Sequence, residues 1–216
     1  VEVDDAGALP FVMMARLEAA ARRALPEMKA ELLPEFKNHS RYGTTRDRFR
    51  RSRLYLPGDQ SKLMLNAGIH KPDGVILDLE DSVAHSEKDS ARLVVRNALR
   101  TVDFFGAERM VRINQLPLGL EDLEYLVPHN PHIILIPKVE DPAQVVAAHE
   151  RIQELRRQHD VKNEIFLMPI VESALGCWRA YEIAAAAPSV VALTIGLEDY
   201  TADIGTQRTN EGVESF

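Results

Sequence analysis

Six short apolar runs recur from residue 51 onward, and they constrain the fold more than any other feature of the sequence. Each run is continuously apolar rather than alternating, which is typical of strands buried on both faces of a parallel sheet. Amphipathic segments separate the runs, and strand–helix units that repeat about every 25–35 residues predict a right-handed parallel β/α array. The predicted strands are Arg53–Pro57, Gly74–Glu80, Arg109–Asn114, Ile133–Lys138, Ile165–Glu172 and Val190–Gly196.

A parallel β/α array can form a Rossmann sheet or a (β/α)₈ barrel, and the sequence favours the barrel. No Gly-x-Gly-x-x-Gly motif follows a predicted strand,. Polar residues instead follow nearly every strand, and barrel sites are assembled from several strand ends in this way. Six β/α units are present where a closed barrel needs eight, so we predict an α/β fold, an incomplete TIM barrel with an N-terminal helical extension,. The predicted barrel helices are Ser61–Ala67, Glu87–Leu99, Gly119–Tyr125, Pro142–Gln158 and Leu175–Ala186.

The bulk composition argues against several classes of function. The 216 residues are 45% apolar and carry a net charge of −7, so no basic footprint for nucleic acid is present,. No apolar run approaches the roughly 20 residues that a membrane span needs. The first ten residues lack the basic start and long apolar centre of a signal peptide,. The single cysteine, Cys177, fits a reducing cytoplasm, and a first residue other than Met suggests a segment of a longer protein,.

The first 50 residues have a different character from the barrel-like remainder. Residues 1–9 resemble a strand and a turn, and Ala8–Leu25 is rich in Ala and Arg and predicted to be helical,. Pro26–Arg50 carries mixed charge and two prolines. That composition predicts a linker, or an arm that lies on the barrel.

Glu172 and Asp199 are the predicted metal ligands. Glu172 closes an apolar strand, and because an unpartnered buried carboxylate is costly, we expect it to face the barrel mouth,. The alternative is a carboxylate that stabilises the N-terminus of the next helix. Glu198 and Asp199 end the following strand, where adjacent side chains point to opposite sides, so one of them reaches the mouth. Two carboxylates at neighbouring strand ends suit Mg²⁺, whereas the histidine spacing does not suit zinc,.

Arg112 ends the third predicted strand, where a guanidinium can bind a carboxylate or carbonyl oxygen with two hydrogen bonds,. The alternative role is an ion pair with Glu80 or Asp81, and the two roles are compatible. Strand periodicity predicts Asp78 and Glu80 on one face and Asp81 on the other, with one acid orienting Arg112 or a metal-bound water. Lys138 is a weaker candidate for a Schiff-base lysine, because no desolvated setting is evident for it.

Together these strand ends resemble the citrate lyase β-subunit family (HpcH/HpaI aldolase/citrate lyase-like), which also includes malyl-CoA and citramalyl-CoA lyases. The resemblance spans residues 51–216. It implies a TIM barrel and Mg²⁺-dependent carbon–carbon cleavage of a β-hydroxyacyl thioester. The segments that carry it are, in order, RSRLYLPGD, VILDLEDSV, VRIN, IPKVED, PIVESALG and GLEDYTADIG.

The resemblance also implies roles for individual residues. The family's metal-binding Glu and Asp correspond to Glu172 and Asp199, with Glu172 also contacting the substrate, and its substrate-binding Arg corresponds to Arg112. An aromatic residue and a lysine that bind the CoA or phosphopantetheine thioester correspond to Tyr55 and Lys62. Related lyases use a further acid from their far C-terminal region, sometimes from a neighbouring subunit. No residue of this sequence corresponds to it, so the general base stays unassigned.

The N-terminal 24 residues resemble the C-terminal end of the citrate lyase γ subunit, an acyl carrier protein. This second resemblance implies a carrier remnant at residues 1–25, a linker or arm at 26–50 and an incomplete lyase barrel at 51–216. The implied partners are an acyl carrier protein domain, the citrate lyase α subunit and other copies of the chain, as a homotrimer.

We therefore predict a Mg²⁺-dependent lyase that cleaves a citryl thioester on the carrier protein into oxaloacetate and an acetyl thioester. A malyl-CoA or citramalyl-CoA lyase is the alternative within the same fold. The alternative of a different class is a non-catalytic barrel remnant that serves as an assembly or carrier-binding module.

Overall fold

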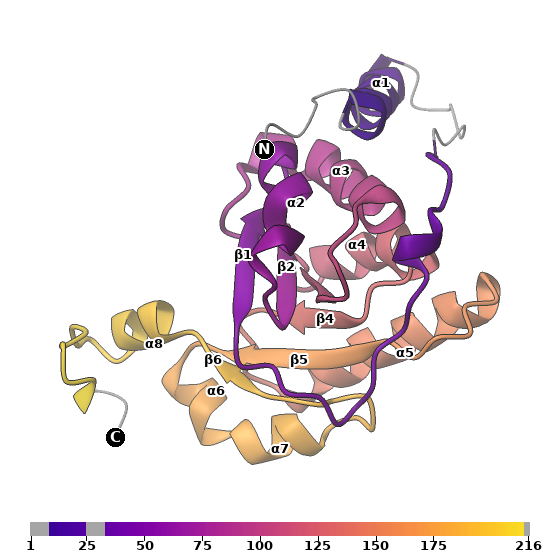
Figure 1. Cartoon of the computed structure of the whole chain (residues 1–216). Coiled ribbons are helices and arrows are strands. Elements are labelled where there is room, and N and C mark those ends of the chain that lie inside the picture. Colours follow the sequence, from indigo (N-terminus) through magenta and orange to yellow (C-terminus); the bar gives the residue numbers. More distant parts are fainter. Residues whose placement is uncertain (1–8, 25–32, 214–216) are drawn as a thin grey trace.

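Six parallel strands form one sheet in the order β1 to β6, and the sheet curls into a half-barrel with helices along its outer side (Figure 1). The computed structural model describes residues 9–24 and 33–213. All five strand pairings are parallel, and each strand pairs with the next along the chain. The strands are β1 (Arg53–Pro57), β2 (Gly74–Asp78), β3 (Glu108–Arg112), β4 (Ile133–Ile136), β5 (Phe166–Val171) and β6 (Thr194–Ile195). The prediction of six β/α units in a parallel array is confirmed.

The first five predicted strands lie within a few residues of the observed ones, and β1 matches at both ends. The sixth was predicted at Val190–Gly196, but only Thr194–Ile195 forms a strand, preceded by an isolated bridge between Val190 and Leu167. In the described part of the chain β6 pairs only with β5. The rest of the predicted run therefore lacks a second neighbouring strand whose backbone hydrogen bonds would keep it extended.

Most of the helices lie along the outer side of the sheet, whereas the last one, α8, extends past the ends of the strands (Figure 1). The helices are α2 (Ser61–Ala67), α3 (Lys88–Thr101), α4 (Leu118–Leu126), α5 (Pro142–Gln158), α6 (Ala174–Trp178), α7 (Ala180–Ala185) and α8 (Leu197–Asp203). Both α2 and α5 have the predicted bounds. Asp141 begins α5 with a capping box to Gln144, which satisfies backbone N–H groups of the first turn,. The single helix predicted over Leu175–Ala186 is instead two short helices that meet at Arg179.

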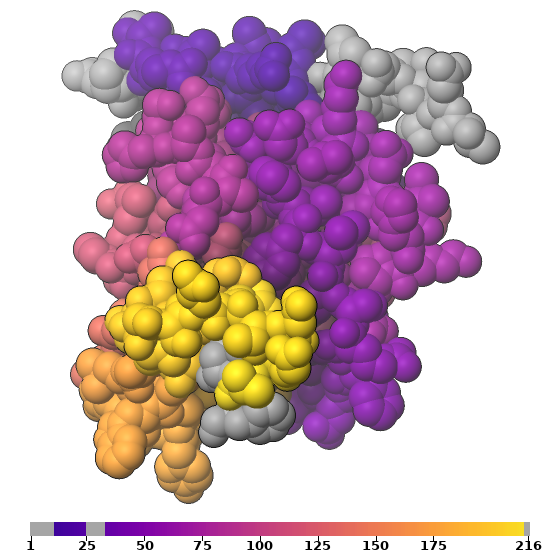
Figure 2. Space-filling model, turned by 90° about the vertical axis from the view of Figure 1, so that its left-hand side faces the viewer, coloured from indigo at the N-terminus to yellow at the C-terminus, as the bar shows by residue number. Residues whose placement is uncertain are grey.

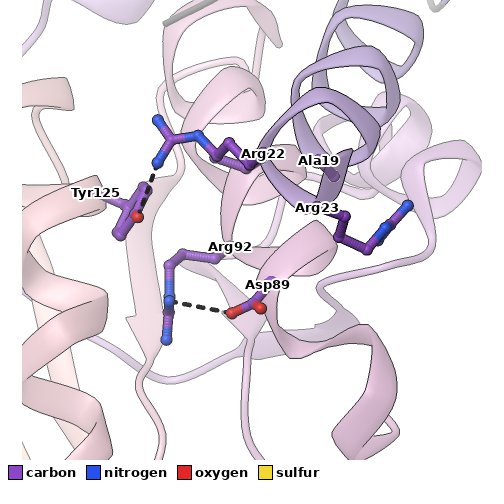
Figure 3. Close-up of a pocket in the computed structure, with 7 residues that line it drawn as sticks. Ala19, Arg22, Arg23, Asp89, Arg92 and Tyr125 are labelled. Atoms are coloured by element: carbon purple, nitrogen blue, oxygen red, sulfur yellow. Dashed lines mark hydrogen bonds and ion pairs between the residues drawn. The ribbon is translucent and has the colours of Figure 1, made fainter. Parts of the chain in front are cut away.

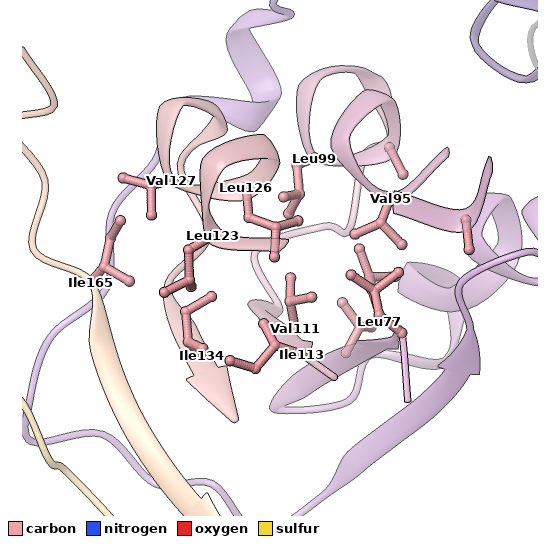
Figure 4. Packing of buried hydrophobic residues seen from close by; sticks show 14 of the residues in the cluster. Leu77, Val95, Leu99, Val111, Ile113, Leu123, Leu126, Val127, Ile134 and Ile165 are labelled. Carbon is pink, nitrogen blue, oxygen red and sulfur yellow. The ribbon is translucent and has the colours of Figure 1, made fainter. Parts of the chain in front are cut away.

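Each strand contributes to two apolar layers, because successive side chains point to opposite faces. On β2 the side chains of Val75 and Leu77 pack outward against the helices, whereas Ile76 joins an inner cluster with residues of β3, β4 and β5. Figure 4 shows part of the outer layer between the sheet and helices α3 and α4, including Leu77, Val111, Ile113, Ile134, Val95, Leu99, Leu123 and Leu126. Burial on both faces explains why these strands are continuously apolar.

An N-terminal helix, α1 (Leu9–Ala24), packs across α3 outside the half-barrel (Figure 1). Its contact is partly ionic: Glu18, which is fully buried, accepts hydrogen bonds at 3.1 and 2.7 Å from the buried guanidinium of Arg96. Figure 3 shows Arg22 of α1 reaching the hydroxyl of Tyr125 on α4, at 3.1 Å, with Arg92 of α3 nearby. The predicted strand and turn at the N-terminus fall largely on residues 1–8, outside the described residues.

The segment from residue 33 to residue 50 runs along the end of the sheet where the strands begin. Arg50 forms a buried ion pair of 2.7 Å with Glu108, the first residue of β3. The backbone carbonyl of Tyr42 accepts hydrogen bonds from Arg109 at 3.0 Å and from His132 at 2.9 Å. Burial lowers the pKa of Arg109 to about 10, since these partners are neutral,. These contacts attach the segment to the half-barrel.

Candidate functional site

Arg112 is the centre of an acidic cluster at the ends of β2 and β3. Asp78 and Arg112 face each other in the register of the two strands, and Asp78 accepts two hydrogen bonds from the guanidinium, at 2.6 and 2.7 Å. Glu80 lies 3.1 Å and Asp81 3.6 Å from Nη1 of the same guanidinium. The predicted ion pair of Arg112 is therefore present, and its closest partner is Asp78.

The prediction that Asp81 points away from Asp78 and Glu80 is wrong. Strand β2 ends at Asp78, and the backbone then turns, with the N–H groups of Glu80 and Ser82 donating to the Asp78 carboxylate. Alternation no longer applies beyond the strand, so all three acids lie around Arg112. Burial acts to raise the pKa of Asp78, but hydrogen bonds from Arg112 and Ser82 outweigh it and lower the pKa below its usual value,.

Tyr55 and Lys62 lie on the first β/α unit, as predicted, but only Tyr55 contacts the cluster. The guanidinium carbon of Arg112 lies 5.3 Å from the centre of the Tyr55 ring, in a cation–π arrangement,. About half of the Tyr55 side chain stays exposed, and burial of the remainder raises the pKa of its phenol. Lys62 is exposed in the first turn of α2.

Glu172 follows β5 and is nearly buried, with 7% of its surface exposed. Its Oε2 accepts a hydrogen bond of 2.7 Å from the backbone N–H of Lys138. Its Oε1 lies against Gly196, where a Cβ atom would come within 2.3 Å of that oxygen. Burial raises the pKa of Glu172, and the charges of Asp199 and Glu80 add to the rise. Gly196 therefore leaves a cradle for the carboxylate, and the N–H group of Lys138 holds the carboxylate in it.

Asp199 lies close to Glu172, although not on the element that was predicted. It belongs to the first turn of α8, a helix that begins directly after Gly196, rather than to an extended strand end. Adjacent residues of a helix point in different directions, so the side chains of Asp199 and Glu198 diverge because of the helix and not because of strand alternation. The Glu198 carboxylate pairs with Arg208. Figure 2 shows this C-terminal segment, in yellow, over the lower middle of the face that it presents.

Glu172 and Asp199 line one cavity of about 350 Å³ with Lys138, Glu140, Ser173 and Asp203. The Lys138 ammonium lies between the acids that follow β2 and Asp199 of α8. It is 3.0 Å from Glu80, 3.3 Å from Asp81 and 3.9 Å from Asp199. Burial acts to lower the pKa of Lys138, but the hydrogen bond and charge of Glu80 raise it above its usual value. A Schiff-base lysine needs a lowered pKa, so the acidic surroundings of Lys138 argue against that hypothesis.

The residues present fit a hard divalent cation. Two carboxylates share the cavity, and one of them lies in the Gly196 cradle, held by the N–H group of Lys138. In the described residues no group of three or more His, Cys, Asp or Glu side chains is gathered for a metal ion. A cation held by two carboxylates leaves positions for water and substrate oxygens, which is the ligand set that Mg²⁺ prefers.

Comparison with known proteins places this chain in a family. Residues 51–216 match the model of the HpcH/HpaI aldolase/citrate lyase family. The chain belongs to this family. The half-barrel described above is consistent with the family's barrel fold, and the chain's relatives include carbon–carbon lyases.

Two relatives and one solved structure illustrate the similarity. The chain is 36% identical over 171 residues to the citrate lyase subunit beta of Leuconostoc mesenteroides subsp. cremoris, covering 78% of this chain and 57% of that protein. It is 35% identical over 167 residues to the L-malyl-CoA/beta-methylmalyl-CoA lyase of Cereibacter sphaeroides, covering 75% and 52%. The citrate lyase beta subunit from M. tuberculosis, complexed with oxaloacetate and magnesium, superposes with a TM-score of 0.55 at 29% identity, covering 82% and 69%.

The chain spans less than three fifths of the length of these two curated relatives. Among the helices that the structure describes, none has both the length and the apolar character needed to cross a bilayer.

Two features of the site were missed by sequence reasoning. Lys138 was considered only as a nucleophile, whereas its backbone N–H holds Glu172 and its ammonium pairs with the acids after β2. Gly196 was not singled out, although a glycine directly before an acidic helix start is a signal of close approach,.

Proposed function

We propose that this chain carries the metal-binding and substrate-orienting residues of a lyase that cleaves a citryl thioester into oxaloacetate and an acetyl thioester. The observation that carries the proposal is the meeting of Glu172 and Asp199 in one cavity, close to the anchored guanidinium of Arg112. The solved relative complexed with oxaloacetate and magnesium supports both the cation and the product.

In this proposal Glu172 and Asp199 would hold Mg²⁺, and the bound ion would supply a Lewis acid that lowers the pKa of the substrate hydroxyl. Arg112 is held by Asp78 at 2.6 Å and lies 3.1 Å from Glu80, so its guanidinium has a fixed position from which it can stabilise negative charge that develops on a substrate oxygen,. Cleavage removes the proton of the β-hydroxyl, breaks the carbon–carbon bond and leaves the electron pair on the thioester enolate. Protonation of that enolate gives the acetyl thioester, while the hydroxyl carbon becomes the keto carbon of oxaloacetate.

The thioester arm of the substrate is proposed to lie along the first β/α unit, against Tyr55 and Lys62. Tyr55 is half exposed beside Arg112, and Lys62 offers an unburied cation in the first turn of α2. An aromatic surface and a lysine suit the pantetheine chain and phosphate that CoA and a carrier protein share. The proposed partners are the carrier protein that delivers the thioester and the citrate lyase α subunit.

Malyl-CoA or citramalyl-CoA is the alternative substrate class, because identity to the malyl-CoA lyase of Cereibacter sphaeroides is nearly the same as to the citrate lyase subunit. Parallel assays with citryl, malyl and citramalyl thioesters, on CoA and on the carrier, would separate these activities in the full-length protein.

The metal site is tested by Glu172→Gln and Asp199→Asn, with Glu182→Gln on the exposed surface of α7 as the matched control. We expect each site variant to abolish Mg²⁺ binding in calorimetry, with and without oxaloacetate, and to abolish thioester cleavage by the full-length protein. The control should retain both. Normal cleavage by either site variant would refute the assignment, and an absence of carboxylate-dependent Mg²⁺ binding would favour a non-catalytic remnant.

A further inference from the structure

Lys138 has an unusual backbone conformation at the centre of the candidate site. It follows β4 with a φ of 51°, in the left-handed region that non-glycine residues seldom occupy,. Such conformations are costly and persist where the surrounding structure holds them, often at functional sites. Here the conformation lets one residue act in two directions. Its N–H donates to Glu172 at 2.7 Å, and its ammonium reaches Glu80 at 3.0 Å.

The two directions lead to two different halves of the site. The first half is the Arg112 cluster, with Asp78, Glu80 and Asp81, and the second is the pair Glu172 and Asp199. Lys138 contacts both halves, since its ammonium lies 3.3 Å from Asp81 and 3.9 Å from Asp199.

We propose that Lys138 is a positioning residue that joins the two halves and confines the divalent cation to the Glu172–Asp199 half. This inference rests on the proposed function. The backbone N–H orients the Glu172 carboxylate by a hydrogen bond. The ammonium forms ion pairs with the carboxylates of Glu80 and Asp81, which would otherwise compete for the cation.

The charges around Lys138 support this role. The ammonium faces carboxylates from the loop after β2 and from α8, and the backbone N–H faces Glu172, which follows β5. Arg112 also pairs with the loop acids. Glu80 also accepts a hydrogen bond of 3.1 Å from Gln115, so its carboxylate is held from several sides. Removing the ammonium would release Asp81 in particular, which is half exposed and otherwise lies 3.6 Å from Arg112.

The test compares Lys138→Met, which removes the charge and keeps the backbone N–H, with Lys138→Arg, which keeps both. Lys162→Met is the matched control, because Lys162 is an exposed lysine that pairs with Asp160 away from the site. Circular dichroism and thermal melting establish that each variant is folded. Mg²⁺ binding is measured by calorimetry, and hydrogen exchange is measured without metal for peptides that cover residues 79–87 and 172–176.

We expect Lys138→Met to bind Mg²⁺ about tenfold more tightly, because a positive charge close to the cation has been removed. A residue with only a structural role would give weaker binding instead. Cleavage by the full-length protein should nevertheless fall, since the cation can now move toward Asp81. Hydrogen exchange in residues 79–87 should accelerate in Lys138→Met and stay unchanged in Lys138→Arg and Lys162→Met.

Unchanged or weaker Mg²⁺ binding by Lys138→Met, or unchanged hydrogen exchange in residues 79–87, would overturn the inference. Glu172→Gln separates this failure from that of the proposed function. If Glu172→Gln abolishes Mg²⁺ binding while Lys138→Met binds as the wild type does, only the role of Lys138 is wrong. If Glu172→Gln binds Mg²⁺ normally, both the metal site and the role of Lys138 are wrong.

Discussion

Replacing Gly196 by alanine tests whether the cradle around Glu172 positions the proposed metal ligand. A Cβ atom at this position would lie 2.3 Å from Oε1, 2.6 Å from Cγ and 2.9 Å from Cδ of Glu172. Ordinary contact begins at 3.4 Å, so the carboxylate must move by about 1 Å. The backbone of Gly196 has a φ of −95°, which alanine adopts without strain,. The substitution therefore acts on the carboxylate rather than on the chain.

The displacement should weaken Mg²⁺ binding far more than it weakens folding. Mg²⁺ requires near-ideal octahedral geometry at about 2.0–2.1 Å, and loss of a group that orients a ligand lowers metal affinity roughly 10- to 100-fold. The displaced carboxylate also loses its hydrogen bond of 2.7 Å to Lys138. That loss is partly offset in the free protein, because a carboxylate that moves toward solvent regains hydration.

Calorimetric titration with Mg²⁺ measures the affinity, and urea unfolding measures the stability of the same samples. Gly43→Ala is the matched control, since a Cβ atom at Gly43 would lie 3.8 Å from the nearest side-chain atom, an ordinary contact. Gly196→Ala should lose at least tenfold in affinity, and Gly43→Ala should lose none. Wild-type affinity in Gly196→Ala would refute the positioning argument.

Two further predictions concern stability. Glu18→Gln should lower the free energy of unfolding by about 3–5 kcal/mol in urea titrations, because it leaves the buried Arg96 without its carboxylate, whereas Glu35→Gln at the surface should leave the free energy of unfolding nearly unchanged,; equal effects would contradict the importance of the buried pair. Burial lowers the pKa values of His129 and His132 to about 3 from 6.5, so between these values the unfolded chain binds protons that the native protein does not. Stability should therefore fall as the pH drops below about 6.5, by up to about 1.4 kcal/mol per pH unit for each histidine, and His132→Gln should flatten that slope; an unchanged slope would exclude His132 as a source.

Much of the local structure could be predicted because it depends on short-range patterns. Continuous apolar runs located β1 to β5, and the bounds of α2 and α5 follow from their amphipathic pattern and flanking residues,. The division of one predicted helix at Arg179 and the shortness of β6 could not be predicted, because both depend on what the segments pack against.

The candidate site divides in the same way. By itself, the sequence determined which residue types follow the strands, and so placed Glu172, Arg112 and Asp78 at one edge of a parallel sheet. It could not place Asp199 on a helix or show that Asp81 turns back toward Arg112, because strand alternation stops where the strand ends,.

Only the tertiary structure brought Lys138 and Gly196 against the Glu172 carboxylate. Lys138 lies 34 residues before Glu172 in the chain, and its contact depends on a left-handed backbone that no local pattern signals. Gly196 comes from another strand end, and its lack of a Cβ atom matters only because the curled sheet brings that backbone to the carboxylate. Neighbouring strands and their curvature set these distances, so the position of the carboxylate is a property of the assembled half-barrel.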